Sequence, residues 1–573
     1  YTMKTYFNKI IVATMLIGLT FSCKDEWVDV APIATEDEAA FYLTQSDAEQ
    51  AVTAVYAQLA YMTTWDRHIQ MLMGSMASDD ADAGGEDQTD VVIYQELDRL
   101  THLPTSEIFS NPFGILYKAI MLANKALEKL PDIPNIDPEA SAAVINERIA
   151  ELKFLRALNY FYLVVCFGEV PLVDHVLGAS EYEQSRSPMR DLFDFMEKDL
   201  KEAIPNLPLT RDAKNIGRAT RGAAQALLAK VYLFESSYAR NYPDDPRFAN
   251  LRERWSEALS TAEEVINSGV YKLVGIDGER YNSFFGEVDG YRFIFTSSGD
   301  NSAESIFEVQ NINDGMGWLQ SRGSSIINWS AARYYDDPAN NKTHQQTSYW
   351  GFNIPREELA KEFESGDPRF PTTIHISRND PRLTNGTINQ PSTNINDSIN
   401  LEKGWFPINY QNSSTGMYQA KFEVSWAEFK GSGTGSWNEA PINTKIIRYA
   451  DVVLIAAEAA VMAGNNAKAL QYINMIRTRA RKCGAPGNTV PADLTGTVTL
   501  DQVKRERRVE LALEGHRFFD LVRWRDAEAK LDGMVRTGDG FVIDYIPGKH
   551  EFFPIPQREI DLSKGKLKQY GNW

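Results

Sequence analysis

A helical segment that is apolar on two sides constrains this chain more than any other feature of its sequence. In residues 149–165, apolar side chains follow the three- and four-residue spacing of a helix on one face, at Leu152, Leu155 and Tyr162, and again on another face, at Phe154, Leu158, Phe161 and Val165. A helix of this kind must be covered by neighbours on both sides, as in stacked helical hairpins. The segment therefore predicts layers of helices rather than one helix laid on a single core.

Similar helical periodicity recurs along the chain, at residues 46–62, 112–130, 189–203, 219–239, 254–268, 447–463, 467–481 and 501–516. The clearest hairpin spans residues 448–480, where Gly464 suits a left-handed C-cap and Asn466 suits the N-cap of the next helix. This hairpin resembles a tetratricopeptide-type repeat, although no strict 34-residue period is present. The predicted fold is mainly α, a degenerate tetratricopeptide-like scaffold with a loop-rich, minor-β subdomain.

The composition changes between residues 271 and 443, where Gly, Asn, Ser, Thr and Asp replace the helical pattern. Short apolar pieces such as "SIFEVQ" suit strands, and "DDPANN" and "GSGTGS" suit turns. Six of the eleven tryptophans fall here: Trp318, Trp329, Trp350, Trp405, Trp426 and Trp437. Loops have few core positions, so tryptophans in this region suggest a binding surface. Half of these rings are expected to pack the loops onto the helices, and Trp318 and Trp350 are the best candidates for exposure.

The first residues have the pattern of a secretion signal. Lys4 and Lys9 precede an apolar run from Ile10 to Phe21, and Ser22 and Cys23 follow it. The apolar run is shorter than the roughly 20 residues that span a bilayer. A cysteine at this boundary is similar to a bacterial lipobox, although Thr20 holds the position where leucine is preferred. We expect residues 1–22 to be a signal peptide and Cys23 to be lipidated.

Charge and cysteine content exclude several classes of protein. The formal net charge is -19, which disfavours nucleic acid as a partner. Only Cys166 and Cys483 follow Cys23, so the chain has neither a disulfide framework nor a cysteine metal cluster. Cys166 is expected to be a small core residue. No catalytic motif is found, and the seven histidines lack the spacing of a zinc site.

Residues 503–524, "VKRERRVELALEGHRFFDLVRW", place Glu506, Glu510 and Glu514 at four-residue spacing on one predicted helix face. Paired carboxylates can serve a glycosidase, but a catalytic acid needs a raised pKa. Neighbouring arginines lower carboxylate pKa values. The predicted pairs are Arg507 with Glu510, and Asp520 with both Arg517 and Arg523. We therefore interpret the stretch as scaffold and predict no catalytic residue.

The acidic loop at residues 77–90, "ASDDADAGGEDQTD", raises the possibility of calcium, because oxygen ligands in a glycine-rich turn suit that ion. Counting from Asp80 puts Gly84 fifth and Val91 twelfth, so an EF-hand loop is excluded. A solvated polar loop is the favoured interpretation, and an irregular calcium site stays open. No other metal or cofactor is expected.

Four stretches taken together resemble the SusD/RagB family of outer-membrane nutrient-binding lipoproteins. They are "ELKFLRALNYFYLVVCFGEVPLV" at 151–173, "GRATRGAAQALLAKVYLF" at 217–234, "RYADVVLIAAEA" at 448–459 and "RERRVELALEGHRFFDLVRW" at 505–524, with the tail "FFPIPQREIDL" at 552–562. The resemblance implies one intertwined unit in three parts: a helical part at 23–270, a variable ligand-binding part at 271–445 and a helical part at 446–573. It also implies a SusC-like TonB-dependent barrel as partner and an outer-membrane, lipid-anchored location facing the cell exterior.

The predicted function is capture of oligosaccharides or polysaccharide fragments for uptake, without catalysis. Sugars stack their C–H faces on aromatic rings and bond their hydroxyls to amides and carboxylates. The ligand-binding candidates, chosen by composition and position, are Trp318, Asn328, Trp329, Tyr349, Trp350, Asp80 and Tyr94. The alternatives are a peptide-binding member of the same kind of uptake system, a helical glycoside hydrolase or lyase, and an assembly adaptor without a ligand. The sequence does not name the glycan.

Overall fold

The computed structural model describes residues 41–64, 68–313, 323–345, 349–401, 404–422 and 440–573. The predicted signal peptide and Cys23 lie outside these residues. Of the six central tryptophans, Trp318, Trp426 and Trp437 also lie outside them.

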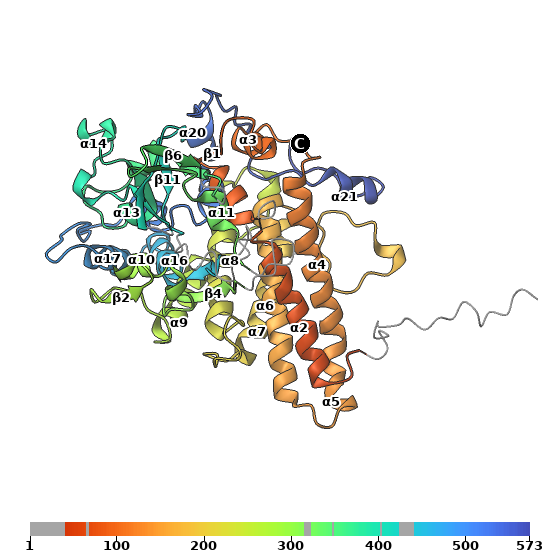
Figure 1. Cartoon of the computed structure of the whole chain (residues 1–573). Helices are drawn as coiled ribbons and strands as arrows, with labels where there is room; N and C mark the ends of the chain where they lie inside the picture. The colour runs from red at the N-terminus through yellow and green to blue at the C-terminus, as the bar shows by residue number, and fades with distance from the viewer. Residues whose placement is uncertain (1–40, 65–67, 314–322, 346–348, 402–403, 423–439) are drawn as a thin grey trace, which may run out of the picture.

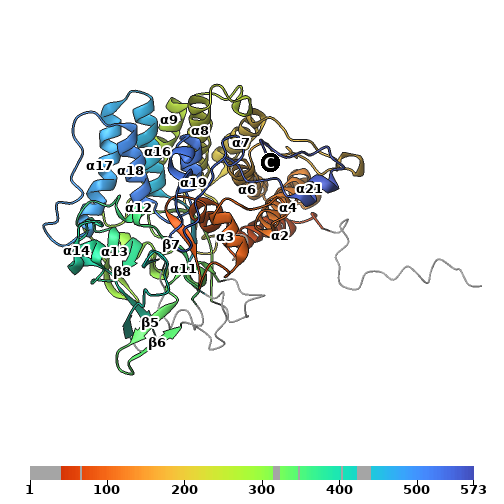
Figure 2. The ribbon, with the colours of Figure 1, turned by 90° about the horizontal axis from the view of Figure 1, so that it is seen from above.

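A row of long helices forms the scaffold, as predicted (Figure 1). The helices are α2 (Gln45–Tyr61), α4 (Glu107–Lys129), α6 (Ala142–Phe167), α7 (Met189–Ala203), α8 (Arg221–Asn241), α9 (Trp255–Asn267), α16 (Tyr449–Met462), α17 (Asn466–Cys483) and α18 (Leu500–Glu510). Each helix from α2 to α17 packs against the next one in this order. In Figure 2 the row follows an arc from α17 to α2, and the strands between residues 334 and 376 lie on one side of it.

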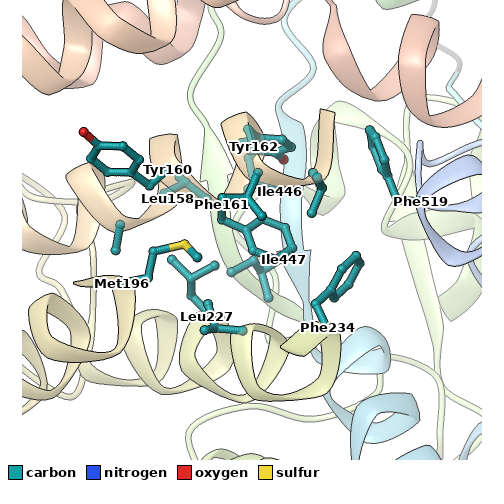
Figure 3. Close-up of a cluster of buried hydrophobic side chains, with 14 of the residues drawn as sticks. Leu158, Tyr160, Phe161, Tyr162, Met196, Leu227, Phe234, Ile446, Ile447 and Phe519 are labelled. Carbon is teal, nitrogen blue, oxygen red and sulfur yellow. The ribbon is translucent and has the colours of Figure 1, made fainter. Parts of the chain in front are cut away.

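Helix α6 is buried on two sides, as its sequence pattern predicts. Every residue from Phe154 to Phe167 is buried, including Cys166. Figure 3 shows the core on one of these sides, where Phe161 meets Leu227 and Phe234 of α8 and Ile447 of a returning strand. The apolar area that these contacts remove from water is the main source of stability for such a stack.

Helix α9 and helix α16 pack against each other although about 180 residues separate them in the sequence. The intervening chain forms most of the loop-rich part and returns through β12 (Thr444–Arg448), which pairs with β4 (Ser305–Val309). The start and the end of the loop-rich part therefore lie side by side on the row of helices. The division of the chain into three parts stays a prediction.

The described strands form two-stranded antiparallel sheets. Besides β4 with β12, the pairs are β1 (Ala81–Gly84) with β7 (Phe352–Pro355), β2 (Arg280–Ser283) with β3 (Gly286–Asp289), β5 (Tyr334–Asp337) with β6 (Lys342–Gln345), β8 (Ile374–Ile376) with β11 (Met417–Gln419), and β9 (Ser398–Leu401) with β10 (Gly404–Pro407). The minor strand content of the central part agrees with the prediction.

Short helices connect these elements. They are α3 (Val92–Asp98), α5 (Ile133–Ile136), α10 (Gly290–Phe293), α11 (Ile326–Ser330), α12 (Glu357–Ala360), α13 (Phe370–Thr373), α14 (Pro381–Thr384), α19 (Arg517–Arg523), α20 (Ala527–Leu531) and α21 (Gln557–Leu562). No described helix is both long enough and apolar enough to cross a membrane.

The predicted helix at 501–516 is too long, because α18 ends at Glu510. Gly515 has φ +81°, and a β-carbon there would lie 2.4 Å from Gln70 in the π-helical turn Gln70–Met76. The close approach of these two backbones requires a glycine turn, so Glu514 is not on the same helix face as Glu506. The cap of α17 is also shifted by one position, from Asn466 to Asn465.

Candidate ligand-binding site

Four aromatic rings from three segments form a stack beside the first sheet. The indole of Trp350 lies parallel to the indole of Trp329, with ring centroids 5.9 Å apart. Trp329 in turn stacks on Phe352 at 5.3 Å. Tyr94 closes the inner end with edge-on contacts to Trp329 and Phe352. We call these four residues the aromatic stack; its two tryptophans are only partly buried.

Backbone pairing brings these distant segments together. In the β1–β7 sheet, Gly84 lies opposite Phe352, and the Gly85 N–H donates to the Gly351 carbonyl at 2.9 Å. A β-carbon on Gly84 would lie 2.3 Å from the same carbonyl, so the approach requires glycine there. The Trp350 N–H donates to the Asn328 carbonyl at 2.7 Å, which fixes the second tryptophan beside α11.

Arg333 packs next to the Trp350 ring of the stack. Its guanidinium carbon lies 5.6 Å from the centroid of the Trp350 ring. The same group donates to the carboxylates of Asp90 and Glu86, each at 2.7 Å. The loop that follows β1 is thereby fastened to the aromatic stack through a side chain that is only 5% exposed.

A polar pocket is lined by the loop that follows β1, the same loop that Arg333 fastens to the aromatic stack. Its floor is ionic: Arg536 contacts Asp82 at 3.0 Å and Asp98 at 2.7 Å, and Arg99 contacts Asp539 at 2.6 Å. The polar pocket is lined by Asp82, Gly84, Gly85, Glu86, Asp87, Gln88, Gln95, Asp98, Arg99, Asn412, Ser414, Arg536, Gly538 and Asp539. Flat rings beside clustered hydroxyl, amide and carboxylate groups form an arrangement that can bind a polar ligand with apolar faces.

Two buried carboxylates of the polar pocket differ in their pKa values. Burial raises the pKa of Asp98 to about 7, despite the neighbouring Arg536. Burial would also raise the pKa of Asp82, but Arg536 and Arg356 together lower it. The Asp98 carboxylate is 3% exposed and accepts a hydrogen bond from the Ala83 N–H at 2.8 Å, so we interpret it as a structural group.

The structure brings four of the predicted site residues to the aromatic stack. Trp329, Trp350 and Tyr94 belong to it, and Asn328 supplies a backbone bond to it. However, Asn328, Tyr349 and Tyr94 are buried, with exposed fractions of 2% or less. The expectation that these three side chains contact a ligand directly does not hold, because they are packed inside. Trp318 lies outside the described residues, so its predicted role is untested.

Asp80 is also buried, which corrects its predicted role. Its carboxylate accepts a hydrogen bond from Arg508 at 2.7 Å, and the neighbouring Asp79 binds Arg517 at 2.7 Å. Arginines thus neutralise Asp79 and Asp80, two of the carboxylates that suggested calcium. Within the described residues, no group of three or more His, Cys, Asp or Glu side chains is placed to hold a metal ion.

Sequence reasoning missed Arg333. It also missed five residues that line the polar pocket, namely Asn412, Ser414, Arg536, Gly538 and Asp539. No local motif marks them. Arg333 is separated by 243 residues from its partner Asp90, so only the folded chain shows the pairing.

The three C-terminal glutamates form a buried ionic network. Arg448 contacts Glu510 at 2.7 Å and Glu514 at 2.6 Å. Arg369 contacts Glu506 at 2.7 Å. Arginines outweigh the effect of burial and lower the pKa of Glu510 well below its usual range and that of Glu514 to about 2. A catalytic acid requires the opposite shift.

The detailed pairing within this stretch differs from the prediction. Asp520 does bind Arg523, at 2.8 Å. Arg507, however, binds Asp520 and Asp451, and Arg517 binds Asp79. Partners from distant segments replace the predicted neighbours because the helix ends before residue 514 and the chain turns.

The fold and the site define a class: a helical-repeat scaffold that carries an aromatic and polar site, built from its loop-rich part together with segments at residues 82–99 and 536–539. The profile of the SusD family matches residues 293–573, and a profile described as "Starch-binding associating with outer membrane" matches residues 27–233. The chain belongs to the SusD/RagB family.

Individual relatives agree with this assignment. A SusD-like protein from Bacteroides ovatus is 24% identical over 523 residues, which are 90% of this chain and 82% of that protein. The starch-binding protein SusD from Bacteroides thetaiotaomicron is 24% identical over 616 residues, 99% of each chain. The solved structure of a laminarin-binding SusD-like protein is 28% identical, with a TM-score of 0.71 over 92% of this chain and 100% of that one.

Proposed function

We propose that this protein is a surface glycan-binding protein of an outer membrane, which captures oligosaccharides or polysaccharide fragments without cleaving them. The observation that carries the proposal is the stacked pair Trp329 and Trp350, which is partly exposed and is connected through Arg333 to the loop that lines the polar pocket. A pyranose ring has an apolar face and a hydroxyl-bearing edge, and these two surfaces are complementary to such a site.

The relatives support the same ligand class. One is named as starch-binding and one as laminarin-binding, and both are matched along nearly their whole length. An aromatic contact contributes roughly 0.5–1.5 kcal/mol beyond area burial. Two rings and a few hydrogen bonds give a dissociation constant in the millimolar to micromolar range, about -4 to -8 kcal/mol. Weak binding suits a protein that must release what it captures.

The location and partner follow from the sequence pattern and the family. Cys23 would bear the lipid anchor after removal of residues 1–22, and stable anchoring requires more than one acyl chain. The matching family description names association with the outer membrane. We therefore propose that the protein faces the cell exterior and passes its glycan to a SusC-like TonB-dependent barrel.

Affinity electrophoresis against a polysaccharide panel tests the proposal. Purified protein should be retarded by at least one glycan, and no reducing ends should appear on incubation. Calorimetry with mixed peptides is the second arm of the experiment. Binding of peptides in place of glycans would replace this proposal with the peptide-uptake alternative, and release of reducing ends would indicate an enzyme.

A further inference from the structure

We infer that the site selects uncharged sugar chains over chains that contain uronates or sulfates. This inference rests on the proposed function and names its substrate class. The charges that surround the polar pocket carry it: the arginines there are already paired, and carboxylates remain in excess at the exposed edge.

The arginines in and next to the polar pocket form ion pairs with carboxylates of the protein. Arg99 contacts Asp539 at 2.6 Å, and Arg536 is shared between Asp82 and Asp98. Arg333, beside Trp350, is held by Asp90 and Glu86. Recognition of a sulfate or carboxylate uses guanidinium or ammonium groups that can turn toward it. Among the described residues that line the polar pocket, no lysine or histidine is present to do so.

The negative charges are exposed. The side chain of Glu86 is 58% exposed, although it shares Arg333 with Asp90. Asp87 is exposed too, and its carboxylate accepts hydrogen bonds from the N–H and hydroxyl of Thr89, each at 2.7 Å. Within the part of the chain that the structure describes, Asp87 has no ion-pair partner. Asp87 therefore adds an exposed negative charge to the lining of the polar pocket, and Arg333, the arginine that acts on it electrostatically, is already paired with Glu86 and Asp90.

Neutral and acidic glycans respond to this edge in opposite ways. Sugar hydroxyls donate hydrogen bonds, and an ionised carboxylate is an acceptor only, so Glu86 and Asp87 favour a neutral chain. A uronate or sulfate would bring a like charge next to Asp87. In water the repulsion between two unit charges 4 Å apart corresponds to roughly a fivefold change in affinity.

A comparison of neutral and charged polymers tests the inference, and its salt dependence separates charge from shape. Laminarin and starch would be compared with their carboxymethylated derivatives, together with alginate and polygalacturonate, by calorimetry at low salt. The carboxymethylated form of the bound polymer is expected to bind at least about fivefold more weakly. The difference should shrink at 0.5 M salt, where the Debye length is well below the roughly 8 Å of physiological salt.

Two variants separate the local charge from the general charge of the chain. Asp87→Asn keeps the oxygen that accepts hydrogen bonds from Thr89. It should bring the dissociation constants of the neutral and the carboxymethylated polymer closer together. Asp212→Asn is the matched control, because Asp212 is equally exposed and accepts similar local hydrogen bonds from Asn215, but lies in a loop that does not line the polar pocket. It should leave the ratio of the two dissociation constants unaltered.

Each outcome has one meaning. Equal or tighter binding of the carboxymethylated polymer, or alginate or polygalacturonate as the tightest ligand, would overturn the inference and leave the proposed function standing. An equal effect of both substitutions would assign the selectivity to net charge and reject the role of Asp87. If none of the polymers bound, the result would contradict the proposed function itself.

Discussion

Arg448 and Glu510 form a buried ion pair, with 2.7 Å between Arg448 Nη1 and Glu510 Oε1 and with neither side chain more than 2% exposed. Arg448 ends the strand β12, through which the chain returns from the loop-rich part, and Glu510 ends helix α18. The pair therefore joins the strand that returns from the loop-rich part to a helix of the scaffold. Truncating one partner of a buried pair leaves the other charge uncompensated.

The first prediction concerns this junction. Glu510→Gln should lower the free energy of unfolding by about 3–5 kcal/mol, because Arg448, Arg479 and Arg369 would lose a shared carboxylate. Urea unfolding followed by circular dichroism measures the change. Glu528→Gln, at an exposed position on α20, should change stability by less than about 0.5 kcal/mol. A loss no larger than that of the control would show that the network does not stabilise the fold.

The second prediction is the response to acid. The pKa of Glu514 is lowered to about 2 from its ordinary value of 4.5, so the unfolded chain takes up this proton at a higher pH than the folded chain does. The stability that Glu514 contributes is therefore fully present above about pH 4.5 and is lost as the pH falls toward 2. Unfolding free energies measured between pH 6 and pH 3 should fall less steeply in Glu514→Gln than in the unaltered protein. Parallel slopes would reject this assignment.

The third prediction tests the turn that shortens α18. Gly515→Ala should destabilise the protein by more than about 3 kcal/mol, because the new β-carbon would meet the Gln70 backbone at 2.4 Å and the residue would keep φ +81°. Gly533→Ala is the matched control: its φ is +71°, but no atom lies within 4 Å of the added carbon. It should cost only about 1 kcal/mol. Thermal unfolding measures the stability of both variants. Equal losses of stability would mean that the close contact between Gly515 and Gln70 does not matter for the fold.

The scaffold could be predicted from the sequence because its signals are local. Apolar spacing within residues 149–165 is sufficient to predict a helix covered on two sides, and α6 is such a helix. Where a helix ends depends on contacts with another segment. Gly515 meets Gln70, which is far away in the sequence, and the periodic pattern through residue 516 therefore extended the predicted helix too far.

The candidate site was predictable only in part, for the same physical reason. The concentration of tryptophans in polar loops pointed to Trp329 and Trp350, which do stack on each other. Composition does not show which of the candidate side chains are bound by residues far away in the sequence. Asp80 is bound by Arg508, 428 residues away, and Tyr94 is enclosed by Trp329 and Phe352.

The measurement that tests the central claim most directly is glycan affinity after removal of the outer indole. Trp350→Ala should weaken binding of the retained polysaccharide at least about tenfold, equivalent to 1.4 kcal/mol, while the far-ultraviolet circular dichroism spectrum stays that of the folded protein. Tyr182→Ala removes a ring that is 67% exposed and lies outside the aromatic stack and the polar pocket, and should leave the affinity unaltered. An undiminished affinity in folded Trp350→Ala would contradict the assignment of the aromatic stack as the glycan site.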